Sequence, residues 1–356
     1  MRFLTFLAVT SLTIVGSATP AKRLDPPAQV EVTLTPQSGS LLKVSVRNVS
    51  KQKLDFFQRG SLLDENPIHK LQVRSASAGE ESSFIGVHPR VRQDGPLNKE
   101  SFRSLKGGKS FEYTLDAAEL YDLTAGGAFE ISTEGLLPYS KPGKNLISGE
   151  ATYKSNTVTL NVNSDDAKHA KGDLERRNRM QPDCTARRRE QASNALAVCA
   201  SIAYVAGEMA LKGSVEQFVR YFRTADPNMR RTVSERFRAV ADECAARSNK
   251  GSTFCTDQRK LCRSDYISYT LGVDITNCDM YWQLPLVNKN CHGIGQATTT
   301  IHEMTHVDGL YKTATDDFPG HYGWPALTDL TPQQAIMNGD NYGFFANAVY
   351  TSDLGC

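Results

Sequence analysis

All eight cysteines of this 356-residue chain lie in its second half. Residues 1–183 contain none, and no two cysteines have the C-x-x-C spacing that is typical of a zinc–thiolate site. An even number of cysteines in an exported protein favours disulfides. The distribution therefore divides the chain into a cysteine-free part and a part that disulfides constrain. The cysteines are Cys184, Cys199, Cys244, Cys255, Cys262, Cys278, Cys291 and Cys356.

The N-terminus has the pattern of a secretory signal. Met1-Arg2 is followed by an apolar run from Phe3 to Val15 and then by small residues. We therefore predict a signal peptide over residues 1–18 and a secreted, extracellular protein. No other segment is expected to reach membrane length, so no membrane partner is predicted. The formal net charge of +2 is nearly balanced, which argues against an electrostatically driven nucleic-acid binder.

The cysteine-free part is predicted to be all-β. Five segments alternate apolar and polar residues, as strands with one buried face do, and clusters of turn-forming residues separate them. A small sandwich-like domain is the expected architecture. His69 and His88 have no convergent partners in the sequence, so they are interpreted as ordinary surface or turn histidines. Asn48 begins an Asn-Val-Ser glycosylation acceptor. The five segments are residues 30–34, 42–46, 111–115, 128–132 and 157–162.

A polar linker over residues 164–183 separates the two parts. It contains the dibasic pair Arg176-Arg177, which processing proteases of the secretory pathway would cut. We predict cleavage after Arg177, with residues 19–177 as a β-rich propeptide and residues 178–356 as the mature domain of a zymogen. Because this propeptide has no cysteine, it cannot offer a thiolate to a metal, and any latency is expected to come from steric cover.

The second part begins with helical periodicity. Helices are predicted over residues 187–211, 215–222 and 228–247, and Cys199 and Cys244 fall within two of them. Residues 266–271 and 279–284 are predicted to be the strands of a hairpin or small sheet. Such a strand could offer its edge to an extended peptide, or it could be purely structural.

Residues His302-Glu303-Met304-Thr305-His306 form an H-E-x-x-H sequence. On a helix, His302 and His306 lie one above the other and can bind one zinc ion, while Glu303 can act on a water bound to that zinc. A catalytic zinc needs a third protein ligand as well.

Two common choices for the third ligand are excluded. No glutamate follows Glu303, and Lys312 occupies the position at which a third histidine would lie. A turn over residues 315–323 is the most plausible source, because its Pro and Gly residues can bring a carboxylate back to the helix. The remaining candidates are Asp308, Asp316, Asp317, His321, Asp329, Asp340 and Asp353.

At this turn the sequence resembles the aspzincins, and within them the deuterolysin family of fungal secreted zinc metalloendopeptidases. That family follows H-E-x-x-H with G-T-x-D-x-x-Y-G, and residues 315–317 match T-x-D. The resemblance implies that Asp317 is the third zinc ligand and that Tyr322 stabilises the oxyanion. Ala314 replaces the first glycine of the motif, and four residues instead of two precede Tyr322. His321, within this longer loop, is the alternative oxyanion donor.

The resemblance covers the whole chain and implies an α+β protein. A mainly helical, zincin-like protease domain with a small β-sheet would follow the all-β, sandwich-like propeptide. Asp340 would line the substrate-binding pocket, and the implied disulfides are Cys184–Cys255, Cys262–Cys278 and Cys291–Cys356, with Cys199–Cys244 as an additional bridge.

The implied function is zinc-dependent hydrolysis of peptide bonds in proteins. The partners would be one Zn²⁺ per chain, protein or peptide substrates with a preference for basic ones, and the chain's own propeptide, in a monomer. Asp340 has no second acid beside it, so strict lysine specificity is not supported. The alternative is a secreted, non-enzymatic binding protein whose zinc is structural and held by four protein ligands.

Overall fold

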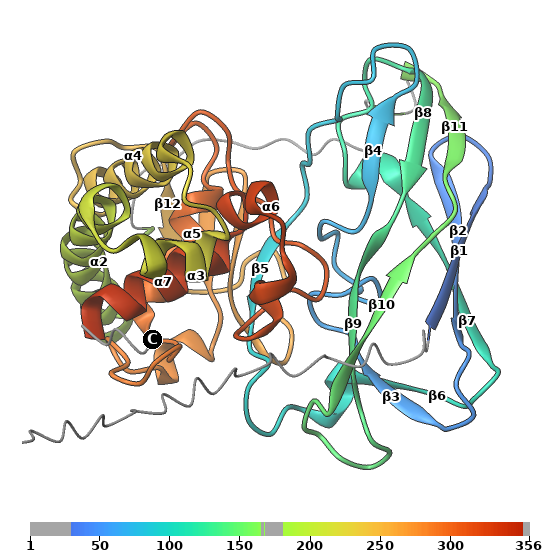
Figure 1. Ribbon diagram of the computed structural model, residues 1–356, viewed down its shortest axis with the longest axis horizontal. Coiled ribbons are helices and arrows are strands. Elements are labelled where there is room, and N and C mark those ends of the chain that lie inside the picture. Colours follow the sequence, from blue (N-terminus) through green and yellow to red (C-terminus); the bar gives the residue numbers. More distant parts are fainter. Residues whose placement is uncertain (1–29, 165–166, 168–180, 352–356) are drawn as a thin grey trace, which may run out of the picture.

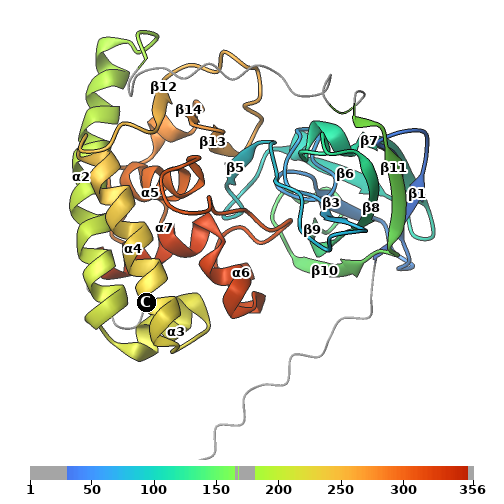
Figure 2. The same cartoon turned by 90° about the horizontal axis from the view of Figure 1, so that it is seen from above.

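The computed structural model describes residues 30–164, 167 and 181–351, which form two lobes joined face to face (Figures 1 and 2). The N-terminal lobe, residues 30–162, is built of strands, and the C-terminal lobe, residues 181–351, is mainly helical. The mixture of helices and sheets confirms the predicted α+β class. The predicted signal peptide, the cleavage after Arg177 and the pairing of Cys356 concern residues outside the described part.

The N-terminal lobe follows the predicted alternation. In β1, Val30, Val32 and Leu34 are buried while Glu31 and Thr33 are exposed. Three sheets, with strand orders β1-β2-β7, β10-β9-β3-β6 and β11-β8-β4, contribute to one hydrophobic core. All five predicted segments coincide with strands, except that Thr157 lies just before β11. The strands are β1 (Val30–Pro36), β2 (Leu41–Asn48), β3 (Leu54–Phe57), β4 (Gln72–Ser75), β5 (His88–Val91), β6 (Phe102–Leu105), β7 (Ser110–Asp116), β8 (Gly127–Ser132), β9 (Glu134–Ser140), β10 (Gly149–Lys154) and β11 (Val158–Val162), with 3₁₀ turns η1 (Lys99–Ser101) and η2 (Ala117–Glu119).

The predicted glycosylation acceptor, Asn48, is buried. Its relative exposure is 0%, and its Nδ2 donates hydrogen bonds to the carbonyls of Gln52 and Leu105. Because the amide nitrogen is already engaged and inaccessible, the folded chain does not present Asn48 as an acceptor.

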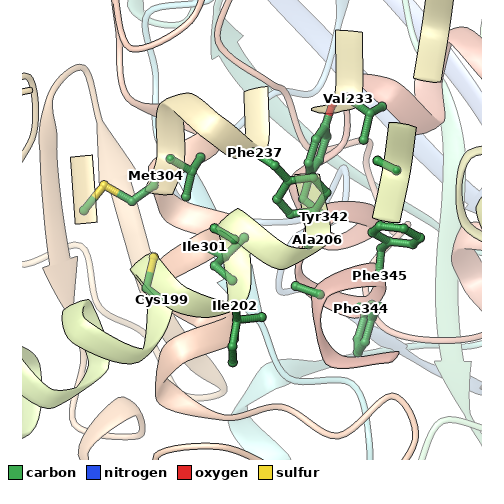
Figure 3. Close-up of a cluster of buried hydrophobic side chains, with 14 of the residues drawn as sticks. Cys199, Ile202, Ala206, Val233, Phe237, Ile301, Met304, Tyr342, Phe344 and Phe345 are labelled. Atoms are coloured by element: carbon green, nitrogen blue, oxygen red, sulfur yellow. The ribbon is translucent and has the colours of Figure 1, made fainter. Parts of the chain in front are cut away.

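The C-terminal lobe packs its helices around one apolar core. The side chain of Thr185 caps the first helix of this lobe, and Asp226 caps the third. Ile202, Phe237 and Ile301, from three different helices, meet in the core (Figure 3). The elements are α2 (Ala186–Lys212), α3 (Val215–Phe222), α4 (Pro227–Cys244), α5 (Gln296–His306), α6 (Pro332–Ile336), α7 (Gly339–Thr351), β12 (Ser252–Phe254), β13 (Tyr266–Leu271), β14 (Asp274–Asn277), η3 (Tyr281–Gln283) and η4 (Ala326–Asp329).

Helix α2 corrects one expectation. At 27 residues it is long enough, and apolar enough, to cross a membrane by length and composition alone, which the sequence reading missed. In the structure, Ala195, Cys199 and Ala203 are fully buried, and α2 packs against α4, α5 and α7. The buried core helix of a folded domain meets the same criteria, so the finding is weak support for a membrane span.

The three predicted helices are confirmed, whereas the second predicted strand is wrong. Residues 279–284 contain the 3₁₀ turn η3, and the strand that pairs with β13 is β14, which comes earlier. Gly272, with a φ of 61°, allows a tight turn directly after β13, so the returning strand begins at Asp274.

Three of the implied disulfides are present: Cys184–Cys255, Cys199–Cys244 and Cys262–Cys278. The second joins α2 to α4. The fourth pairing, Cys291–Cys356, stays a prediction because Cys356 lies outside the described residues.

Strand β5 connects the two lobes. It belongs to the N-terminal part of the sequence, but it pairs antiparallel with β13 at the edge of the sheet β12-β14-β13-β5 (Figure 2). Side chains reinforce this junction: Asp265 accepts hydrogen bonds from Arg92 (2.8 Å) and Ser101 (2.9 Å), and Tyr266 donates to Asp64 (2.7 Å). Of the two alternatives for this strand, an edge open to a peptide or a structural strand, the full chain therefore shows an edge of β13 covered by its own N-terminal lobe.

Candidate metal centre

Helix α5 and the turn after it bring three ligand atoms together. The Nε2 atoms of His302 and His306 are 3.2 Å apart, and Oδ2 of Asp317 lies 3.6 Å from the first and 3.3 Å from the second. Ligands bound tetrahedrally to zinc at 2.0–2.1 Å lie about 3.3 Å from each other. The spacing of these atoms therefore fits a single zinc ion.

The charges and the unpaired atoms of this centre also fit a cation. Both carboxylate oxygens of Asp317 are buried and have no hydrogen-bond partner among the described residues. Burial disfavours the charged imidazole of His302, but the nearby carboxylates of Asp317 and Asp340 outweigh burial and raise its pKa to about 9. Burial opposes the ionisation of Asp317 as well, yet the two histidines hold its pKa below the usual value. A buried group of this kind attracts positive charge, which a divalent cation would supply.

Each histidine is oriented by a contact at its other ring nitrogen. Nδ1 of His306 donates a hydrogen bond to the carbonyl of Thr315 (2.8 Å), and Nδ1 of His302 lies 3.0 Å from Oδ1 of Asp340. Such contacts keep the proton on Nδ1 and leave the Nε2 lone pair free for a metal.

Thr315 fixes the turn that returns Asp317 to the helix. Its amide donates to the carbonyl of Thr305 (2.9 Å), and the two threonine hydroxyls are 2.6 Å apart. Thr315 is fully buried. The turn predicted from its Pro and Gly residues is therefore anchored to helix α5 through Thr315.

Glu303 is fully buried and is held by strand β13. Ser268 Oγ donates to its Oε1 (2.5 Å), and Thr270 Oγ1 donates to its Oε2 (2.6 Å). Burial raises the pKa of Glu303, while His302, His306 and the two hydroxyls partly oppose the increase. A carboxylate whose pKa is shifted towards neutrality suits a general base.

The comparisons with known proteins agree with this geometry. Residues 1–356 match the family model described as deuterolysin metalloprotease (M35). The chain belongs to this family. A neutral protease 2 homologue of Botryotinia fuckeliana is 35% identical over 363 residues, which cover 99% of both chains. The neutral protease 2 of Aspergillus oryzae is 36% identical over 329 residues, which cover 90% of this chain and 91% of that protein. The protein is therefore a metalloprotease, and the alternative of a non-enzymatic binding protein is set aside.

The longer loop of this deuterolysin contacts the N-terminal lobe. The amide of Gly320 donates to the carbonyl of Gly60 (2.7 Å), and the carbonyl of Pro319 accepts from the amide of Leu136 (3.1 Å). His321 turns its Nδ1 towards the carbonyl of Pro319 (3.1 Å), and burial lowers its pKa to about 4. The longer loop that precedes Tyr322 thus lies at the junction between the lobes.

Tyr322 and Asp340 are both buried near the metal centre. The ring of Tyr322 packs against Gly60, where an added Cβ would lie 2.4 Å from the ring, and burial together with Asp317 raises its pKa well above the usual value. Asp340 accepts a hydrogen bond from the amide of Gly323 (2.8 Å), and its Oδ1 lies 3.3 Å from Nε of Arg90. Their predicted roles, oxyanion donor and substrate-binding acid, stay predictions.

The interpretation of His69 and His88 as ordinary surface or turn histidines was wrong. His88 is 7% exposed and stacks on His306, with ring centroids 4.5 Å apart, and Nδ1 of His69 lies 3.3 Å from Asp316. Burial and the nearby His306 lower the pKa of His88 to about 3, so its imidazole is neutral. No local pattern could reveal these contacts, because the partners lie more than 200 residues away in the sequence.

Sequence reasoning also missed Ser268 and Thr270, which hold Glu303, and Arg90, which contacts Asp340. The predicted strand over residues 266–271 contained a usable signal. Ser268 and Thr270 alternate along it, so both hydroxyls point to one face of the sheet.

Gly339, at the start of α7, allows the two histidines to approach each other. A Cβ at this position would lie 2.7 Å from Nε2 of His306 and 3.0 Å from Nδ1 of His302. Gly339→Ala is therefore expected to displace both rings and to lower zinc affinity by at least about tenfold, as measured by competition with a chelator. Gly251→Ala is the control, because its added Cβ would have no neighbour closer than 3.4 Å. Unchanged affinity in the Gly339 variant would contradict the proposed positions of the ligands.

Proposed function

We propose that this deuterolysin is a secreted zinc endopeptidase whose metal ligands are His302, His306 and Asp317. The observation that carries the proposal is the convergence of two Nε2 atoms and one carboxylate oxygen, separated by 3.2, 3.3 and 3.6 Å. When bound, zinc would supply Lewis acidity that acidifies a water molecule and polarises the scissile carbonyl.

Glu303 would move the proton in this reaction. Its carboxylate takes a proton from the attacking water and later delivers it to the leaving amine. Ser268 and Thr270 hold the carboxylate in place, and its raised pKa favours both steps. Asp340 would act through His302 by keeping the proton on Nδ1, 3.0 Å away.

Tyr322 is the proposed oxyanion donor. Burial and the nearby Asp317 raise the pKa of its phenol, so the hydroxyl keeps the proton that a donor needs. His321 is the weaker candidate, because its Nδ1 faces the carbonyl of Pro319.

A preference for basic substrates is supported by the contacts of Arg90. Its guanidinium, on the strand that covers the site, lies 3.3 Å from Oδ1 of Asp340, donates to the carbonyl of Thr298 (2.7 Å) and lies 5.8 Å from the ring centroid of Phe344. A basic side chain of a substrate would find the same acid, carbonyl and aromatic face.

The domain organisation is proposed as well. Residues 1–18 would be the signal peptide, residues 19–177 a propeptide released by cleavage after Arg177, and residues 178–356 the active monomer. The three disulfides support export, because such bonds persist in oxidising compartments.

Metal removal tests the proposed chemistry. Dialysis of the processed enzyme against 1,10-phenanthroline is expected to abolish casein hydrolysis, and stoichiometric Zn²⁺ is expected to restore it. Activity and zinc content are measured on the same samples. Full activity in metal-free enzyme would contradict a zinc mechanism, whereas restoration by Ca²⁺ alone would show that the metal stabilises the fold and takes no part in catalysis.

A further inference from the structure

Strand β5 lies directly over the metal centre. It pairs antiparallel with β13, so that His88 is opposite Thr270 and Arg90 is opposite Ser268. Thr270 and Ser268 are the residues whose hydroxyls hold Glu303. The strand also contacts α5, the helix that carries both metal-binding histidines. The N-terminal lobe therefore reaches the centre with a specific pair of side chains.

The first of these side chains, His88, meets the metal ligands. His88, His306 and Asp317 each offer a ligand atom, and these atoms lie within 4.8 Å of one another. Nδ1 of His88 is buried and has no hydrogen-bond partner among the described residues. Two overlapping sets of three ligands thus share His306 and Asp317: His302 completes one set and His88 completes the other.

We propose that, in the full chain, the His88 ring turns out of its stack on His306 when metal binds and becomes a fourth protein ligand beside His302, His306 and Asp317. The inference rests on the metal centre of the proposed function. A catalytic zinc keeps one position for water, whereas four protein ligands give the closed shell of a structural zinc. The full chain therefore stores its metal in an inactive form. Release of β5 would withdraw the imidazole of His88 and leave one position of the metal open to water.

Arg90 holds His88 in register. Its guanidinium lies 3.3 Å from Asp340, which in turn contacts His302, and it donates to the carbonyl of Thr298 (2.7 Å). Gly343 leaves room for it, because a Cβ there would lie 2.9 Å from Nη2 of Arg90. Strand β5 thus places His88 beside the metal ligands and Arg90 in the proposed pocket for a basic side chain. The sequence predicted that latency would come from steric cover. The proposal adds a ligand exchange, in which water would replace His88 when β5 is released.

The test measures metal binding by the full chain in a Glu303→Gln background, which prevents self-cleavage. His88→Phe keeps an aromatic ring for the stack on His306 but removes the ligand atoms. We expect its affinity for Zn²⁺, measured by chelator competition, to fall by at least about tenfold. We also expect the visible absorption of the Co²⁺-loaded protein to change as one nitrogen ligand is lost. His88→Gln is made in parallel, because its side chain fits the same space if phenylalanine prevents folding.

His69→Phe is the matched control. His69 belongs to the same lobe and lies at the same junction, but it pairs with Asp316. The inference holds if the His88 variants alone lose affinity and change the Co²⁺ spectrum. It is overturned if they match the parent, or if His69→Phe causes the same loss, since that would reflect weaker docking of the lobe. Asp317→Ala in the same background separates the two hypotheses: if it too leaves affinity and spectrum unchanged, the proposed metal centre itself is wrong.

Discussion

Replacing Glu303 with glutamine in the processed enzyme is expected to lower kcat for casein hydrolysis by about 10² to 10⁴-fold while zinc stays bound. The amide has nearly the size of the carboxylate and can still accept a hydrogen bond from Ser268 or Thr270, but it cannot take a proton from water. His302, His306 and Asp317 are untouched, so zinc content should not change. Steady-state kinetics and metal analysis on one preparation measure both quantities.

Glu243→Gln is the matched control for this experiment. Glu243 is also fully buried, and it accepts hydrogen bonds from the amides of Lys250 (3.1 Å) and Gly251 (3.0 Å) near the end of α4. Its replacement should lower stability without changing kcat of the folded enzyme. If Glu303→Gln kept a kcat close to that of the parent, Glu303 could not be the general base.

The local elements of this fold could be predicted from periodicity. Alternation in residues 30–34 and a helical stripe in residues 187–211 both reflect one buried face, and burial in the structure follows the same faces. The predicted strand over residues 279–284 failed because apolar side chains such as Tyr281 are buried from a 3₁₀ turn as effectively as from a strand. Apolar content alone does not distinguish these two conformations.

The metal centre was predictable to the extent that its residues are close in sequence. The spacing of His302 and His306 places both on one helical face, and the turn after the helix limited the third ligand to a few candidates. The contributions of His88 and Arg90 were not predictable. They depend on β5 pairing with β13 across some 180 residues, and neither the composition of β5 nor its periodicity indicates a partner.

Replacing Asp317 with alanine in the processed enzyme is expected to abolish activity by releasing the metal. Asp317 supplies one of three protein ligands, and its loss should cost at least the roughly 10 to 100-fold in affinity that even indirect changes around a metal cost. Zinc content after dialysis against a chelator measures the effect.

Asp316→Ala is the control, because the neighbouring carboxylate pairs in the full chain with His69 of the N-terminal lobe, at 3.3 Å, and is not a proposed metal ligand. It should retain zinc. If Asp317→Ala kept its zinc instead, then Asp340, which lies 3.0 Å from Nδ1 of His302, or His321 would be the candidate ligand.

The Asp317→Ala substitution should lower zinc affinity less in the full chain than in the processed enzyme. In the full chain, removal of Asp317 leaves the imidazoles of His302, His306 and His88, and three neutral nitrogen ligands are sufficient to hold zinc in proteins. After β5 is released, the processed enzyme has two imidazoles left. Zinc affinity of Asp317→Ala should therefore fall further on processing than the affinity of the parent does. No change in zinc affinity on processing, in either protein, would mean that His88 contributes nothing to the metal in the full chain, even if Asp317 is a ligand.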